Sequence, residues 1–135
     1  MTVSQLSIFL QNSPGHLASN LELLETNGIS LKGYNISDTG DYGILRIIVD
    51  NPISALEVLK SANIAVVNTS VLCIKLPDNP GELLKIAQTL NKAGINIDYS
   101  YSLIDNLIVV KTSDDKAALK SLTESHAQLI ENNQL

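Results

Sequence analysis

Cysteine and basic residues are scarce in this sequence, and long apolar runs are missing. The one cysteine, Cys73, excludes a disulfide within the chain, and its apolar neighbours predict a buried structural thiol rather than a nucleophile. The nine lysine and arginine residues are scattered and the formal net charge is -5, which argues against nucleic acid and anionic membranes as partners. No run approaches the about 18 apolar residues of a membrane span, and the N-terminus lacks a basic signal region. We therefore expect a cytoplasmic protein that makes no membrane contacts.

Residue sets that carry catalysis or bind metals are missing as well. His16 and His126 lie far apart in the chain, and no cysteine or carboxylate cluster at ligand spacing accompanies them. No Ser/His/Asp or Cys/His combination is visible, and segment 39–43 lacks the length and the lysine of a phosphate-binding loop. We therefore expect no metal, no cofactor and no enzymatic activity.

The sequence contains an internal repeat. A shift of 66 positions pairs Pro14-Gly15 with Pro80-Gly81, and Gly28-Ile29 with Gly94-Ile95. Apolar residues match at the same strand and helix positions: Leu6, Ile8, Leu10, Leu17 and Leu24 pair with Leu72, Ile74, Leu76, Leu83 and Leu90. With 44% hydrophobic and 17% charged residues, the chain can form a folded core. We expect two modules, residues 1–68 and 69–135.

Each copy is expected to fold as strand, helix, two strands, helix and strand. In the first copy, apolar residues alternate along a strand and then line one helical face. We expect Ser13 to cap that helix, with Pro14 and Gly15 as its first residues, and Asn51-Pro52 to start the second helix. The expected strands of this copy are 6–10, 30–37, 42–49 and 64–67.

The second copy has the same expected order, and its end is less regular. Its expected segments are strands at 71–76, 96–102 and 107–112, a helix at 80–93 and a helix opened by Ser113-Asp114. Beyond Leu122 no clear final strand is visible, so the copy is truncated or ends in a longer helix. The first copy has the longer hairpin loop, with four extra residues at 38–41.

The segment order predicts an α+β fold of two ferredoxin-like βαββαβ modules. Each module has an antiparallel sheet with both helices on one face. A half of about 65 residues is marginally stable alone, because small domains bury a smaller fraction of their surface. Pairing between copies or between chains is therefore expected.

Two strand-to-helix turns are the strongest functional candidates, residues 12–17 and 78–83. Each contains Pro-Gly at the start of a helix, where unpaired backbone N–H groups and the positive end of the helix dipole can receive a carboxylate. For a single turn, a compact way of starting a helix is the more frequent explanation. The turn occurs twice here, in the same setting.

The repeated turn, followed by Gly94-Ile95-Asn96-Ile97 in the second copy, closely resembles the ACT domain family over nearly the whole chain. Tandem copies without an attached enzyme look like free-standing ACT pairs that sense amino acids. The resemblance implies an amino acid held between two modules, by the turn and by a polar residue at the start of the second strand. The implied ligand-binding positions are Asn12, Pro14, Gly15, His16, Leu17, Ser30, Asp78, Asn79, Gly81, Glu82, Leu83 and Asn96.

The two copies differ at these positions. Ser30 replaces the asparagine expected at the second strand, and Asp78 with Glu82 makes the second turn acidic. Acidic groups near a helix start repel an incoming carboxylate. We expect the first turn to hold the effector's carboxylate, and Asp78 or Glu82 to pair with its ammonium group. A capping box between Asn79 and Glu82 is the more frequent structural explanation for Glu82.

Several other residues have structural explanations. Tyr34, Tyr99 and Tyr101 lie in or beside the second strands, where they either line a ligand pocket or pack against the sheet. Arg46 is expected to form a salt bridge or part of a dimer face. On the sheet face away from the helices, Phe9, Ile44 and Ile48 have partly polar counterparts at Lys75, Leu107 or Ile108, and Val110.

Such an apolar face should not stay in water, so we expect a homodimer. The main functional alternative is a protein-docking regulatory subunit of an enzyme of amino-acid metabolism, or a repressor-like adaptor. A third alternative is a small isomerase- or cyclase-like enzyme on a dimeric scaffold. A sensor should be stabilised by a free amino acid, whereas an adaptor should require its partner protein.

Overall fold

The structure is a computed structural model that describes residues 1–11, 13–38 and 40–135. It contains two compact units. The N-terminal module comprises Ser4–Ser70 together with Leu135, and the C-terminal module comprises Val71–Gln134 together with Met1–Val3. Strand β4 (Val66–Lys75) runs from one unit into the other, so the boundary between residues 68 and 69 remains a prediction.

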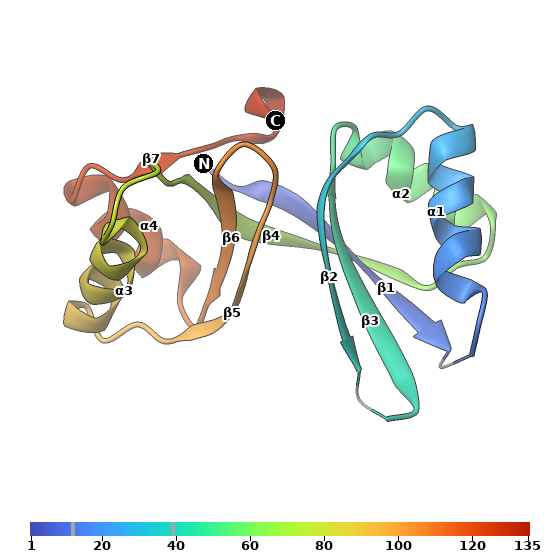
Figure 1. Cartoon of the computed structure of the whole chain (residues 1–135), viewed down its shortest axis with the longest axis horizontal. Coiled ribbons are helices and arrows are strands. Elements are labelled where there is room, and N and C mark those ends of the chain that lie inside the picture. Colours follow the sequence, from blue (N-terminus) through green and yellow to red (C-terminus); the bar gives the residue numbers. More distant parts are fainter. Residues whose placement is uncertain (12, 39) are drawn as a thin grey trace. The chain divides into compact units, whose positions relative to one another are not determined.

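The N-terminal module has the expected βαββαβ order. Its elements are β1 (Val3–Gln11), α1 (His16–Thr26), β2 (Leu31–Asp38), β3 (Tyr42–Val49), α2 (Pro52–Ser61) and the first half of β4. The strands lie in the order β2-β3-β1-β4, with β1 antiparallel to β3 and β2 antiparallel to β3. Both helices lie on one side of these strands (Figure 1), as the ferredoxin-like fold requires.

The C-terminal module repeats this arrangement, from the second half of β4 onward. Its further elements are α3 (Glu82–Lys92), β5 (Ile97–Ser102), β6 (Leu107–Thr112), α4 (Asp115–Glu124), β7 (Gln128–Leu129) and a 3-10 turn at Asn132–Gln134. The strand order is β5-β6-β4, with β7 on the other side of β4. The short strand β7 therefore takes the place for which the sequence showed no clear strand.

The two strands expected at 64–67 and 71–76 are one continuous strand, and the prediction of a break between them was wrong. Strand β4 closes the first module and opens the second. The polar residues Asn68, Thr69 and Ser70 are β residues within it. Polar side chains do not interrupt the backbone hydrogen bonds of a strand, so this polar stretch continues β4.

Each module has its own apolar core between helices and sheet. The core of the N-terminal module consists of Leu6, Ile8, Leu10, Leu24, Ile29, Leu45, Ile47, Val49, Ala55 and Leu59. The core of the C-terminal module consists of Leu72, Ile74, Ile86, Leu90, Ile95, Ile108, Val110, Ala118 and Leu122. Alternate strand residues supply both cores, because side chains of a strand point to opposite faces in turn.

This alternation corrects part of the predicted outer face. Ile108 and Val110 belong to the helix-side core, so they are not the counterparts of Ile44 and Ile48. In the N-terminal module Ile48 is fully buried, whereas Phe9, which pairs with Ile44 across the strands, is 47% exposed. Among the described helices, none is long and apolar enough to cross a membrane.

Candidate functional site

Both candidate turns have the same backbone shape, which differs from the expected one. Helix α1 begins at His16 and α3 at Glu82, with Gly15 and Gly81 as N-caps at φ 95° and 88°. The prediction that Ser13 caps a helix beginning at Pro14 was wrong. The Ser13 N–H donates to the Gln11 carbonyl at 2.8 Å, and Ser13 lies before the helix rather than at its N-cap. Only glycine adopts this left-handed conformation without strain.

The capping box expected between Asn79 and Glu82 is also absent. Gly81, not Asn79, is the N-cap of α3, and no side chain caps either α1 or α3. Asn79 instead donates its N–H to the Pro77 carbonyl at 2.8 Å, in the same manner as Ser13. Glu82 pairs with Lys85, with 3.1 Å between carboxylate oxygen and ammonium nitrogen. A salt bridge one turn along the helix therefore replaces the cap.

The starts of α1 and α3 consequently offer N–H groups that no N-cap side chain occupies, as far as the described residues show. A methyl group built on Gly15 or Gly81 would meet no atom within 4 Å, so a ligand can approach the backbone closely. The first turn of α1 contains no acidic residue, whereas that of α3 contains Glu82. Since the N-terminal end of a helix attracts anions, the first turn is the better carboxylate site of the two.

The side chains around the first turn differ in exposure. Pro14 and Gly15 are exposed, His16 is half-buried, and Leu17 packs against the core of the N-terminal module. Its counterpart Leu83 is 56% exposed. Asn12 lies outside the described residues. Leu17 thus contributes mainly to packing, and Leu83 offers an open apolar surface.

Asn20 on α1 is a polar residue that the sequence reasoning did not single out. It is 7% exposed, and its Nδ2 donates to the His16 carbonyl at 2.6 Å. Its Oδ1 is buried and has no hydrogen-bond partner. One repeat later the equivalent residue is Ile86, a core residue. The repeat alignment contains this signal, as an asparagine at a position that is apolar in the other copy.

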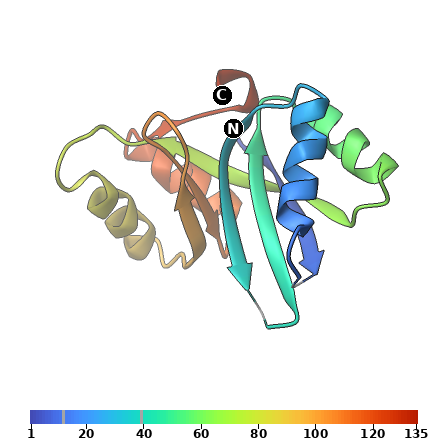
Figure 2. The same ribbon diagram turned by 45° about the vertical axis from the view of Figure 1, so that its right-hand side comes forward.

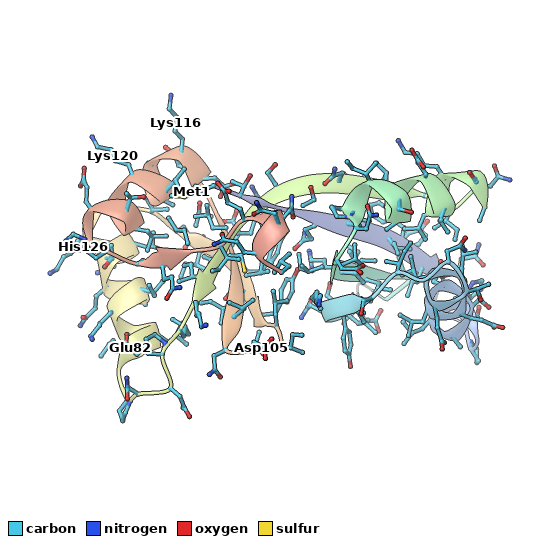
Figure 3. The ribbon with its side chains drawn as sticks, turned by 90° about the horizontal axis from the view of Figure 1, so that it is seen from above. Met1, Glu82, Asp105, Lys116, Lys120 and His126 are labelled. Carbon is cyan, nitrogen blue, oxygen red and sulfur yellow. The ribbon has the colours of Figure 1, made fainter. Side chains whose placement is uncertain are left out.

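The acidic residues of the second turn line two different grooves. Asp78 and Pro77 face the tip of the β5–β6 hairpin, with Asp105 and Asn106, across a groove of about 460 Å³. Glu82 instead lines a groove of about 380 Å³ between α3 and the segment Ser125–Ala127. Figure 3 shows Glu82 at the start of α3 and Asp105 on the hairpin, well separated. The turn therefore does not bring Asp78 and Glu82 onto one ligand.

The polar residues at the start of the second strands, Ser30 and Asn96, donate their backbone N–H groups to side-chain oxygens. The Ser30 N–H donates to Oδ1 of Asp50 at 2.9 Å, and the Asn96 N–H donates to Oγ of Ser113 at 3.1 Å. Nδ2 of Asn96 donates to Oδ1 of Asp98 at 3.1 Å. Both residues are exposed, so their remaining acceptor groups face solvent.

Within one module, the turn and the second-strand residue lie at opposite ends. Helix α1 has 11 residues and is therefore about 16 Å long, at about 1.5 Å per residue. The helix leads from the turn at Gly15 to the opposite end of the module, where Ser30 precedes β2. Gln11 pairs with Tyr42, so the turn lies at the hairpin-tip end of the module, away from Ser30 (Figure 2). A single module cannot bring its own turn and strand residue to one ligand.

A family model described as an ACT domain pair matches residues 1–135. The chain belongs to the ACT domain pair family. ACT domains are regulatory modules without catalytic activity, and the pair is typical of proteins that respond to small molecules such as amino acids. The predicted family and the predicted ferredoxin-like fold are thus confirmed.

Solved structures share the fold of this chain. The chain is similar to a crystal structure of a protein from Bacteroides thetaiotaomicron, with 35% identity, coverage of 99% of this chain and 95% of that one, and a TM-score of 0.94. The regulatory subunit of aspartate kinase from Thermus thermophilus has 20% identity, 90% coverage of each chain and a TM-score of 0.61. The subunit from Thermus flavus has 18% identity, coverage of 91% and 92%, and a TM-score of 0.59. The Thermus likeness shows the fold alone. No curated protein matches the chain.

The other residues considered in the sequence, three tyrosines and Arg46, differ in their contacts. Tyr99 and Tyr101 stack with ring centroids 6.5 Å apart, whereas Tyr34 is 57% exposed. Arg46 donates to Oγ of Ser37 at 3.2 Å and to Oδ1 of Asn35 at 3.4 Å.

Cys73 is fully buried, and burial raises the pKa of its thiol to about 11. The thiolate is therefore disfavoured, and the predicted burial of Cys73 is confirmed. The described residues contain no group of three or more His, Cys, Asp or Glu side chains placed to hold a metal ion.

Proposed function

We propose that this ACT pair is a non-catalytic sensor that binds an amino acid between two modules. The first turn holds the effector's carboxylate on the N–H groups at the start of α1. The observation that carries the proposal is the uncapped helix start behind Gly15, with open space above the glycine and no acidic residue in the first helical turn. A dipole end and free N–H groups are what a carboxylate requires.

The effector's ammonium group is paired with an acidic residue of the second turn. Asp78 is the better of the two predicted partners, because Glu82 already forms a salt bridge with Lys85. Asp78 is exposed, lines its groove and forms no salt bridge with any of the described residues. A charge-assisted hydrogen bond to the ammonium would then distinguish amino acids from other carboxylates.

We further propose that every effector site needs two modules and that the protein is a homodimer. The turn and the strand residue of one module lie at opposite ends of α1, so Ser30 or Asn96 must come from a different module than the turn. The apolar side chains of Phe9, Tyr42 and Val67 are 47%, 58% and 50% exposed. Because apolar surface in water is unfavourable, we expect an assembly to bury them. Effector binding would then favour one placement of the modules over another, which is the regulatory output.

The second candidate function is a regulatory subunit that docks on an enzyme of amino-acid metabolism or acts as a repressor-like adaptor. The same exposed apolar side chains favour it, since they fit a protein partner as well as a second copy. Such a subunit would use the ACT fold without needing a free amino acid.

A thermal-shift screen against the twenty amino acids and several 2-oxo acids separates these candidates. A sensor is stabilised by one amino acid or a related few, by an amount that grows as the logarithm of ligand concentration. A flat response to all of them would contradict the sensor and support the docking subunit.

Two matched variants locate the carboxylate site. Gly15→Val and Gly81→Val both place a β-branched residue at positive φ in open space, so both should destabilise by about 1–2 kcal/mol. Only Gly15→Val should abolish the effector response. An equal loss of response in both variants would show that the first turn is not the carboxylate site. Light scattering that gave the mass of a single chain at micromolar concentration would contradict the homodimer.

A further inference from the structure

Helix α1 buries an amide oxygen that has no partner. Oδ1 of Asn20 is enclosed in the N-terminal module, and Asn20 as a whole is 7% exposed. A buried acceptor without a donor lowers stability, because it has lost its water and gained nothing in return. The repeat shows that an apolar side chain fits this position, since Ile86 occupies it in the other module. An asparagine here therefore requires a reason other than packing.

The side chain of Asn20 is bonded to the first turn of α1, the turn that offers the proposed carboxylate site. Its Nδ2 donates to the His16 carbonyl at 2.6 Å, which fixes the amide against the first turn of α1. Side chains of a helix point toward its N-terminus, so this orientation is also the one that the backbone favours. His16 is the first residue of α1, immediately after Gly15. The amide that carries the free oxygen is thus bonded to the residue that begins the helix.

An α-amino acid can use both groups. Its ammonium is attached to the carbon next to the carboxylate, so a carboxylate on the N–H groups of α1 holds the ammonium near the same turn. Oδ1 of an amide only accepts hydrogen bonds, and an ammonium group has three donors. Asn20 can therefore take one donor while a carboxylate such as Asp78 takes another.

We propose that Oδ1 of Asn20 accepts a hydrogen bond from the α-ammonium group of the effector. Asn20 is then a specificity-determining residue that separates amino acids from their 2-oxo acids, which have no such donor. The inference rests on the proposed sensor function. Because Oδ1 is covered in the free chain, effector binding requires a local rearrangement that uncovers it.

The second turn cannot accept a hydrogen bond from an ammonium group in this way. Ile86 offers no acceptor at the equivalent position, and Glu82 at the helix start repels a carboxylate. The two turns of one chain therefore differ in their affinity for an amino acid. The chain binds the amino acid preferentially at its first turn.

The test compares the amino acid found by the screen with its own 2-oxo acid, by isothermal titration calorimetry. The wild-type protein should prefer the amino acid, and Asn20→Leu should lower that preference by about tenfold or more, because a site built to accept a hydrogen bond rejects an analogue that lacks the donor. Asn27→Leu is the matched control. Nδ2 of Asn27 donates to the Leu23 carbonyl at 2.8 Å, four residues back as in Asn20, but Asn27 is exposed at the other end of α1.

The outcomes separate the inference from the function on which it rests. If the wild-type protein binds no amino acid, the sensor proposal fails. If it binds one and Asn20→Leu keeps the wild-type ratio of amino acid to 2-oxo acid, the role of Asn20 is overturned and the sensor stands. Asn20→Ile, the side chain that the C-terminal module accommodates, repeats the test should the leucine variant fold poorly, as judged by circular dichroism.

Discussion

The two modules share a backbone and differ in polar chemistry. Equivalent leucines fill both cores, and both first helices begin after a glycine at positive φ. In contrast, Asn20 in the N-terminal module corresponds to Ile86, and His16 at the first turn corresponds to Glu82. The comparison teaches that the fold depends on apolar periodicity and helix-end glycines. The differences lie at the start of α1, where the proposed effector site is, so the modules share an architecture and differ in the chemistry of that site.

The largest predicted effects come from equivalent core leucines. Leu24 and Leu90 are 3% and 1% exposed, so Leu24→Ala and Leu90→Ala should each destabilise by about 2–5 kcal/mol through lost burial and a residual cavity. Hydrogen exchange measured by mass spectrometry should show the loss of protection mainly in the module that carries the change. The exposed neighbours Glu25 and Asn91 serve as alanine controls, with effects within about 0.5 kcal/mol. Equal loss of protection in both modules would show that they unfold as one unit.

Exchanging the buried residues of the two modules sharpens the contrast further. Asn20→Ile should stabilise the N-terminal module by about 1–3 kcal/mol in the absence of effector, because it removes an unpaired buried acceptor. Ile86→Asn should destabilise the C-terminal module by a similar amount or more, because it introduces one. Chemical denaturation measures both changes. Stabilities that fall in both variants would mean that Asn20 already has a partner, such as a buried water.

Much of the fold could be predicted because it follows from periodic patterns. The hairpin strand at Tyr42–Val49 and the strand at Leu107–Thr112 have the predicted bounds, and Asn51 caps α2 as expected, accepting from the Ser54 N–H at 3.1 Å. Both ends of β4 were predicted as strands, but their continuity was missed because the middle of β4 is polar; β7 was missed because two residues are too short for a pattern. The candidate turns were found, but not their shape. The left-handed conformation of Gly15 was missed because glycine also fits the second position of a helix that begins at Pro14.

Helix caps provide a test of intermediate size. Asn51→Ala and Asp114→Ala remove side chains that accept from N–H groups at 3.1 and 3.0 Å, and each should destabilise by about 1 kcal/mol. Ser13→Ala and Asn79→Ala should cost less than about 0.5 kcal/mol, because neither side chain caps a helix. Thermal unfolding of the four variants measures the contrast. A loss of 1 kcal/mol from Ser13→Ala would restore the capping role expected from the sequence.

The smallest predicted effect depends on pH and is confined to the C-terminal module. Helix α4 begins with Asp115, where α2 begins with Pro52. Burial tends to raise the pKa of Asp115, but hydrogen bonds from Lys111 and Thr112 and the charge of Lys111 outweigh it and lower the pKa below 3.8. Folding therefore favours the ionised form. Its contribution is fully present above the unfolded pKa and is lost as the pH falls through the folded pKa.

Replacing Asp115 by asparagine should make this dependence disappear. Asp115→Asn should destabilise by at most about 1 kcal/mol at neutral pH, since both partners of the salt bridge are partly exposed. The difference from the wild-type protein should shrink as the pH falls from about 5 to about 2, because the wild-type carboxylate then becomes protonated as well. Asp105→Asn, at an exposed hairpin position where asparagine tolerates the positive φ of 58°, is the control. A constant difference between the Asp115 variant and the wild type over this range would mean that the carboxylate's charge contributes nothing, and that its hydrogen bonds alone stabilise the start of α4.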